Sequence, residues 1–107
     1  MRVLLDNCTP RGVASSLRGH AVKECRSQGW DRLRNGELLD AAEAAGFEVF
    51  LTADQNVRYQ QNLLRRQIAI VVLKSGAWEI LRPHLDRIRE AVEAAEPGSI
   101  TEISIPE

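Results

Sequence analysis

The chain has 107 residues, of which 44% are hydrophobic and 27% charged, and its formal net charge is −1. A chain of this length has room for one hydrophobic core, so we expect a single domain over residues 1–107. The composition is that of a globular protein and not of a disordered one. The near-neutral charge argues against a strongly basic protein that binds nucleic acid nonspecifically.

The sequence also bears on membranes and on redox chemistry. The longest apolar run, residues 68–73, is far too short to cross a bilayer, so we expect no membrane association. The first residues lack the apolar core and cleavage site of a signal peptide. Cys8 and Cys25 stand in no Cys-x-x-Cys spacing, which argues against a disulfide framework or a zinc site. These features predict a cytoplasmic protein with reduced thiols, and we expect Cys8 to be a small buried residue.

The first half of the chain reads as two strands and two helices. Residues 2–5 form a short apolar run that suits a buried strand. A helix is expected next, with Thr9 as its N-cap and Pro10 in its first turn. Residues 20–25 suggest a short second strand. The clearest helix covers 35–45, where an apolar stripe faces inward, Asp40 and Glu43 face solvent, and Gly46 ends the helix.

The second half continues the alternation. A buried strand is expected over 47–52, a helix over 56–66 and a further buried strand over 68–73. Residues 78–95 form a long amphipathic stretch in which Pro83 marks either the first turn or a break. Near the end, Ile100, Ile103 and Ile105 indicate an edge strand.

Strands that alternate with helices predict an α/β fold, namely a three-layer α/β/α sandwich with a mainly parallel central sheet. The handedness of the crossovers then places the carboxyl ends of the strands along one edge. Open α/β sheets bind their ligands at that edge.

Three acids are expected to meet at this edge. Asp6 and Asp54 each follow an apolar strand, and Glu37 lies in the first turn of the helix that leads to the second of these strands. Carboxylates that lie close together repel one another unless a cation offsets their charge. Carboxylate oxygens suit Mg²⁺ or Mn²⁺, and two such ions can stabilise both the attacking and the leaving oxygen of a phosphodiester.

Each acid also has a purely structural explanation. Asp6 and Asp54 could cap the helices that follow them, and Glu37 lies where the helix dipole favours an acid. Asn35 reads well as an N-cap. The three acids together are more informative than any one, because independent capping would not require them to share an edge.

Residues 56–66 mix amides, arginines and one aromatic beside the expected site. Arg58 could follow an RNA backbone while Tyr59 stacks on a base. The competing interpretation is a solvated helix face with Tyr59 in the core. Twelve of the fourteen basic residues are Arg, which binds phosphate well, although a GC-rich genome would explain the same bias.

Three segments in this order resemble a known family: residues 4–7, 35–39 and 51–56, which read LLDN, NGELL and LTADQN. Over nearly its whole length the chain resembles small bacterial PIN-like domains related to the VapC-type toxin ribonucleases.

The resemblance implies a metal-dependent ribonuclease that is the toxin of a toxin–antitoxin pair and forms a homodimer. Asp6, Glu37 and Asp54 would hold Mg²⁺ or Mn²⁺, and an activated water would attack the RNA phosphodiester. The side chains that would orient ligands or substrate are Asn7, Asn35, Asn56, Arg58 and Tyr59.

The chain departs from the family pattern at several of these positions. The helix acid of ordinary PIN domains falls on Asn35, so Glu37 would be its replacement. Asn7 and Cys8 stand where close relatives often carry Glu and Asn, and Asn56 stands where many carry Asp. A neutral amide is a poorer ligand for a hard cation than a carboxylate. The alternative function is therefore a PIN-like module that has lost catalysis and binds protein or RNA.

A response-regulator-like receiver domain also uses acids at strand ends. Lys74 follows a late strand as such a domain requires, but the acidic pair expected after the first strand is absent.

Overall fold

A computed structural model describes residues 1–33, 35–54 and 66–104. Five strands form one sheet in the order β2-β1-β3-β4-β5, and each of its pairings is parallel. The strands are β1 (Arg2–Leu5), β2 (Ala21–Glu24), β3 (Val49–Thr52), β4 (Ala69–Leu73) and β5 (Ile100–Ile103). The predicted α/β fold with a mainly parallel sheet is confirmed, and β5 is an edge strand as expected. The helix expected over 56–66 lies outside the described residues except for Arg66.

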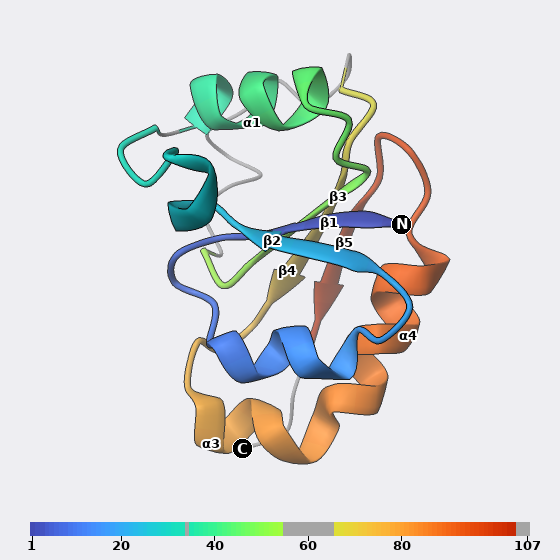
Figure 1. Cartoon of the computed structure of the whole chain (residues 1–107). Helices are drawn as coiled ribbons and strands as arrows, with labels where there is room; N and C mark the ends of the chain where they lie inside the picture. Colours follow the sequence, from blue (N-terminus) through green and yellow to red (C-terminus); the bar gives the residue numbers. More distant parts are fainter. Residues whose placement is uncertain (34, 55–65, 105–107) are drawn as a thin grey trace.

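Helical elements lie on both sides of the sheet, as Figure 1 shows. On one side lie α1 (Asn35–Ala44) and the 3₁₀ helix η2 (Arg26–Gln28). On the other lie the 3₁₀ helix η1 (Arg11–Ser16), α3 (Trp78–Leu81), the 3₁₀ helix η3 (Arg82–His84) and α4 (Leu85–Ala94). None of the helices in the described ranges is both long and apolar enough to span a membrane.

The hydrophobic core is divided by the sheet into two clusters. Leu4 and Phe50 belong to the cluster beneath α1, whereas Val3 and Leu51 belong to the cluster that also contains Ile88 of α4. Because the central strands are covered on both faces, all residues of β3 and β4 are buried. This explains why those two strands are continuous apolar runs, with Thr52 the one polar exception in them.

The segment after β1 differs from the expected helix. Residues 11–16 form a 3₁₀ helix whose N-cap is Pro10, with no side-chain cap. Thr9 is buried, and its hydroxyl donates a 3.3 Å hydrogen bond to the carbonyl oxygen of Leu51. Close packing contributes to the local geometry, since a Cβ atom at Gly12 would lie 2.3 Å from the ring of Trp78. The prediction of Thr9 as an N-cap was therefore wrong, because its hydroxyl bonds to β3 instead of to the first turn of the helix.

The amphipathic stretch near the C-terminus is interrupted at Pro83. Proline lacks the backbone N–H that continues an α-helix, and the chain here passes from α3 through η3 into α4. Pro83 therefore marks a break, one of the two expected alternatives. Within α4, Ile88 and Val92 are buried against the sheet as the spacing predicts.

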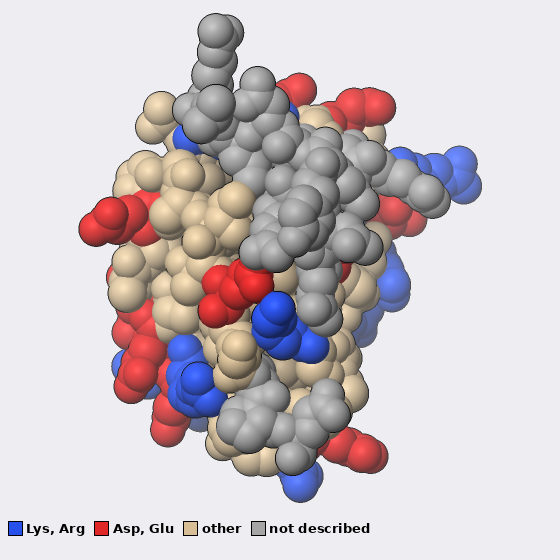
Figure 2. Space-filling model, turned by 180° about the vertical axis from the view of Figure 1, so that it is seen from behind, with Lys and Arg blue, Asp and Glu red and all other residues tan. Residues whose placement is uncertain are grey.

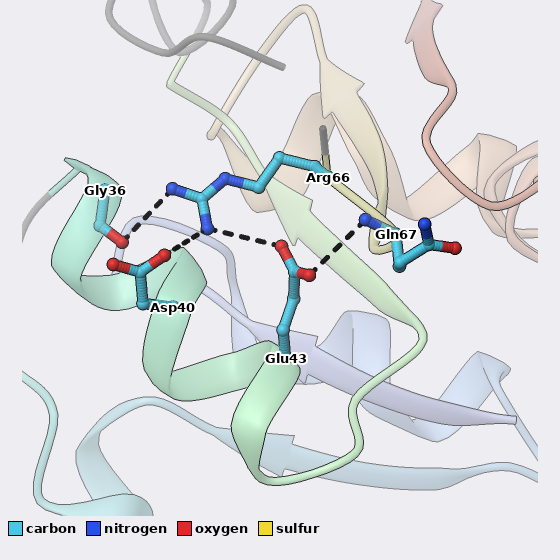
Figure 3. A network of polar contacts seen from close by, with 5 residues as sticks. All are labelled: Gly36, Asp40, Glu43, Arg66 and Gln67. Atoms are coloured by element: carbon cyan, nitrogen blue, oxygen red, sulfur yellow. Dashed lines mark hydrogen bonds and ion pairs between the residues drawn. The ribbon is translucent and has the colours of Figure 1, made fainter. Parts of the chain in front are cut away.

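Arg66 ties α1 to the segment that enters β4 (Figure 3). Its guanidinium donates to the carboxylates of Asp40 and Glu43 and, over 3.4 Å, to the carbonyl oxygen of Gly36. The backbone N–H of Gln67 donates to the other oxygen of Glu43. Glu43 therefore does not simply face solvent as expected. Because Gly36 lies in the first turn of α1, the network helps to fix the end of the helix that carries Glu37.

Candidate functional site at the carboxyl edge of the sheet

The strands β1 and β3 are neighbours, although the chain passes through β2 between them. The connection from β1 to β2 carries η1 on one side of the sheet, and the connection from β2 to β3 carries α1 on the other. In parallel sheets such a reversal leaves a crevice at the carboxyl ends of the two strands, where ligands bind. Asp6 follows β1 at this point, and Thr52 is the last residue of β3.

The carboxylate of Asp6 is held by groups from both strands. Its Oδ2 atom accepts a 2.7 Å hydrogen bond from the hydroxyl of Thr52 and a 3.2 Å hydrogen bond from the thiol of Cys8. Its Oδ1 atom accepts a 2.8 Å hydrogen bond from the backbone N–H of Asn7. Asp6 is only partly buried. The carboxylate is thus fixed in orientation while part of it faces solvent.

Thr52 connects the two predicted strand-end acids. Its side chain is fully buried, and its hydroxyl oxygen accepts a 3.0 Å hydrogen bond from the backbone N–H of Asp54 while donating to Asp6. One hydroxyl therefore sets both the direction of the Asp6 carboxylate and the backbone position of Asp54. The sequence contained a signal for this role, because a threonine in a buried apolar strand needs a partner for its hydroxyl.

Cys8 belongs to this cluster and is exposed, so the expectation of a buried residue was wrong. Its sulfur also lies 3.6 Å from the hydroxyl oxygen of Thr52. Desolvation of the thiol raises the pKa of Cys8; the hydrogen bond to Thr52 opposes this rise, and the charge of Asp6 adds to it. Near neutral pH the group is accordingly a protonated donor to Asp6 and a weak nucleophile.

Cys25 lies just beyond the end of β2, beside Asp6. Its backbone N–H donates a 3.0 Å hydrogen bond to the carbonyl oxygen of Leu5, which continues the ladder between β1 and β2. The side chain is fully buried. Burial, followed by the nearby charge of Asp6, raises the pKa of Cys25 to about 12. This thiol is part of the core beneath α1.

Glu37 lies in the first turn of α1 and is exposed. Figure 1 shows that α1 begins near the edge of the sheet where β1 ends. Within the described ranges, no three His, Cys, Asp or Glu side chains form a group that could hold a metal ion. Glu37 as a third ligand beside Asp6 and Asp54 therefore stays a prediction.

The remaining predicted site residues are placed in part. Asn7 is exposed, and its backbone rather than its side chain bonds to Asp6. Asn35 is the first residue of α1, and its side chain is not among those described. Asn56, Arg58 and Tyr59 lie outside the described residues.

The described surface has no broad basic area on the face shown in Figure 2, where Lys and Arg are interspersed with Asp and Glu. This matches the net charge of −1. Any contact with a polyanion on this face therefore depends on a few well-placed cations and not on a basic surface.

No protein-family model matches the chain, and neither the curated proteins nor the solved structures contain a significant match. Fold and site together define an α/β protein with a parallel sheet and a polar cluster, built on Asp6 and Thr52, at the junction of β1 and β3.

Proposed function

We propose that this protein is a divalent-metal-dependent ribonuclease of the PIN-like kind. The observation that carries the proposal is the link from Asp6 through the hydroxyl of Thr52 to the backbone of Asp54, at the point where the strand order reverses. Two acids from distant parts of the sequence are thereby held at the edge where parallel sheets bind ligands.

The chemistry of the donors suits a hard cation. A carboxylate has about four lone-pair positions, and Asp6 uses three of them for the hydrogen bonds described above. Asp6 thus keeps acceptor capacity on its solvent side, and Asp54 is exposed. We propose that Asp6, Asp54 and Glu37 bind Mg²⁺ or Mn²⁺, and that Thr52 orients Asp6. The ion would activate a water and stabilise the charge that develops on the phosphodiester.

The biological setting that we propose follows from the resemblance to PIN-like toxin ribonucleases. The substrate is RNA, the protein is the toxin of a toxin–antitoxin pair in the cytoplasm, and it acts as a homodimer that an antitoxin protein inhibits. Asn7, Asn35, Asn56, Arg58 and Tyr59 orient the ligands or the substrate in this proposal.

The test is an RNA-cleavage assay with increasing Mn²⁺ on the wild type, Asp6→Asn and Asp54→Asn. Asp86→Asn is the matched control, because Asp86 is an exposed acid in the first turn of α4. We expect cleavage to require metal, to fall on the order of 100-fold in each site variant and to persist in the control. Intact RNA at millimolar Mn²⁺ would rule out the ribonuclease. Unchanged cleavage in both site variants would assign the activity to other residues.

Two observations favour a second candidate, a PIN-like module that has lost catalysis and binds protein or RNA. The described residues contain no group of three metal-ligating side chains, and position 35 carries an amide where the resemblance calls for an acid. This candidate predicts that the wild type binds RNA or a protein partner without cleavage and takes up no Mn²⁺ at millimolar concentration. Calorimetric titration of Mn²⁺ into the wild type and the Asp6→Asn variant separates the two functions.

A further inference from the structure

A small pocket opens next to Asp6, on the side of the site that faces β2. Its volume is about 30 Å³. That is room for about one water molecule or one phosphate oxygen, and far too little for a nucleobase. The residues that line it are Asp6, Asn7, Thr9, Arg11, Glu24 and Arg26.

Two arginines reach this pocket because of the strand register. Arg11 begins η1, which follows β1, and Arg26 begins η2, which follows β2. The strands are parallel neighbours with Leu5 opposite Glu24, so both 3₁₀ helices start at the same edge of the sheet. Two guanidinium groups from separate connections are thereby placed beside one carboxylate of the candidate site.

The two arginines differ in their partners. The Nε atom of Arg11 lies 3.3 Å from a carboxylate oxygen of Glu24, but the Arg11 side chain is 72% exposed, so the pair is weak. Arg26 is exposed and makes no ion pair with any of the described residues. At least one guanidinium at the pocket is therefore paired with no acid among the described residues.

We infer that this pocket is a subsite that takes one oxygen of a phosphate group of single-stranded RNA, and that Arg26 and Arg11 bind this phosphate beside the phosphodiester that is cleaved at Asp6. The inference rests on the proposed ribonuclease function. Guanidinium groups match phosphate because they donate two parallel hydrogen bonds to it. An entering phosphate would compete with Glu24 for Arg11. The size of the pocket limits the recognition to backbone oxygens, so the subsite reads no base.

The negative charge of Asp6 at the pocket wall also affects phosphate binding. A phosphate next to an uncompensated carboxylate is repelled, and a cation on Asp6 removes that repulsion. Binding of Mn²⁺ and binding of phosphate are therefore expected to strengthen each other by the same factor.

Two variants of residues that line the pocket are expected to act in opposite directions. Arg26→Gln removes a donor and should weaken phosphate binding about fivefold to tenfold. Glu24→Gln frees Arg11 and removes a negative charge, so it should strengthen binding about twofold to fivefold. Arg87→Gln is the matched control, because Arg87 is an exposed arginine on α4.

The experiment is an NMR titration of the full chain with inorganic phosphate, with and without Mg²⁺ as the diamagnetic ion. We expect saturable shifts of the amide signals of Asn7, Arg11 and Arg26, tighter binding with Mg²⁺, and the two opposite responses above. Shifts that spread evenly over the surface, or equal affinities in the wild type, Arg26→Gln and Glu24→Gln, would overturn the inference.

A parallel binding assay with a short single-stranded RNA separates this inference from the ribonuclease proposal. With Ca²⁺ in place of Mn²⁺, Arg26→Gln should make the negative slope of log affinity against log salt less steep by about 0.7. This is the change expected for the loss of one phosphate contact. Phosphate binding that depends on Arg26, in a protein that leaves RNA intact, would keep the subsite and reject the nuclease. Cleavage with an unchanged salt slope in Arg26→Gln would keep the nuclease and reject the subsite.

Discussion

The hydroxyl of Thr52 donates a 2.7 Å hydrogen bond to Asp6 Oδ2 and thereby joins the ends of β3 and β1. The same oxygen accepts the backbone N–H of Asp54, so both of its functions are used within the candidate site. The neighbouring main chains are also joined there, since the N–H of Asp6 donates to the carbonyl oxygen of Leu51. The polar cluster is thus part of the sheet and not an addition to its surface.

Replacing Thr52 by valine keeps the shape of the side chain and removes the hydroxyl. Asp6 then loses one donor, and the N–H of Asp54 loses its acceptor. We expect Thr52→Val to lower the free energy of unfolding by about 1–3 kcal/mol in urea titrations. Thr52→Ser is the control and should lose less, because the hydroxyl remains. Equal losses in the two variants would show that packing of the methyl group, and not the hydrogen bonds, is what matters.

The two thiols should differ sharply in reactivity. Cys25 is fully buried with a pKa of about 12, so its thiolate fraction at pH 8 is about 10⁻⁴. Cys8 is exposed, but its raised pKa should make it slower than a free thiol. We expect alkylation followed by mass spectrometry to label Cys8 alone in the native protein, and both cysteines after denaturation. Native Cys8→Ser should stay unlabelled, and rapid labelling of Cys25 would contradict its burial.

Cys8 also offers a test of metal binding that does not depend on activity. The charge of Asp6 contributes to the raised pKa of Cys8. A cation bound to Asp6 would offset that charge and increase the thiolate fraction. We therefore expect Mg²⁺ to accelerate alkylation of Cys8 in the wild type and to have no effect in Asp6→Asn. The same rate with and without the ion would count against a metal at Asp6.

Arg66 should contribute measurably to stability. Its side chain is 17% exposed and donates to two carboxylates and one carbonyl oxygen (Figure 3). We expect Arg66→Met to lower the free energy of unfolding by about 1–2 kcal/mol, since hydrogen bonds to charged groups exceed neutral ones in strength. Arg89→Met is the comparison, because Arg89 is 51% exposed in a pair with Glu93 and should lose less than about 0.5 kcal/mol.

Acid should weaken the contact between His20, in the turn before β2, and Glu93 of α4. His20 contacts Glu93 at 2.9 Å and, with help from Arg89, lowers the pKa of Glu93 below its ordinary value of 4.5. A carboxyl with a lowered folded-state pKa stabilises the protein above its unfolded-state pKa. That stabilisation is lost as the pH falls through the folded-state value. The difference in unfolding midpoint between the wild type and Glu93→Gln should therefore shrink as the pH falls below about 4.5. A difference that grows on acidification would have the wrong sign.

Much of the fold was predictable because the relevant signals are local. The buried strands β3 and β4 are almost continuous apolar runs, and α1 ends at Ala44, two residues before Gly46, whose φ of 85° is left-handed as a helix-ending glycine requires. Sheet order was not predictable in this way. It depends on which strands a crossover joins, and no residue pattern within β1 indicates that its neighbours are β2 and β3.

The candidate site was predictable only in outline. Asp6 was identifiable because it follows an apolar run, but the hydrogen bond from Cys8 arises from a turn that has no sequence signature. The 3₁₀ geometry of η1 was missed because its determinants are distant. The ring of Trp78 packs against Gly12, and Thr9 bonds to β3. Such long-range contacts override the local preference for an α-helix.

The position of β1 between β2 and β3 also shapes how the chain folds. Residues 2–5 are made before both strands with which they pair, residues 21–24 on one side and residues 49–51 on the other. Until residues 49–51 have been made, this apolar strand has at least one open edge, and open edges promote association between nascent chains. We expect refolding to be limited by the distant pairing of β1 with β3 and the yield to fall with concentration, even where the folded protein is stable.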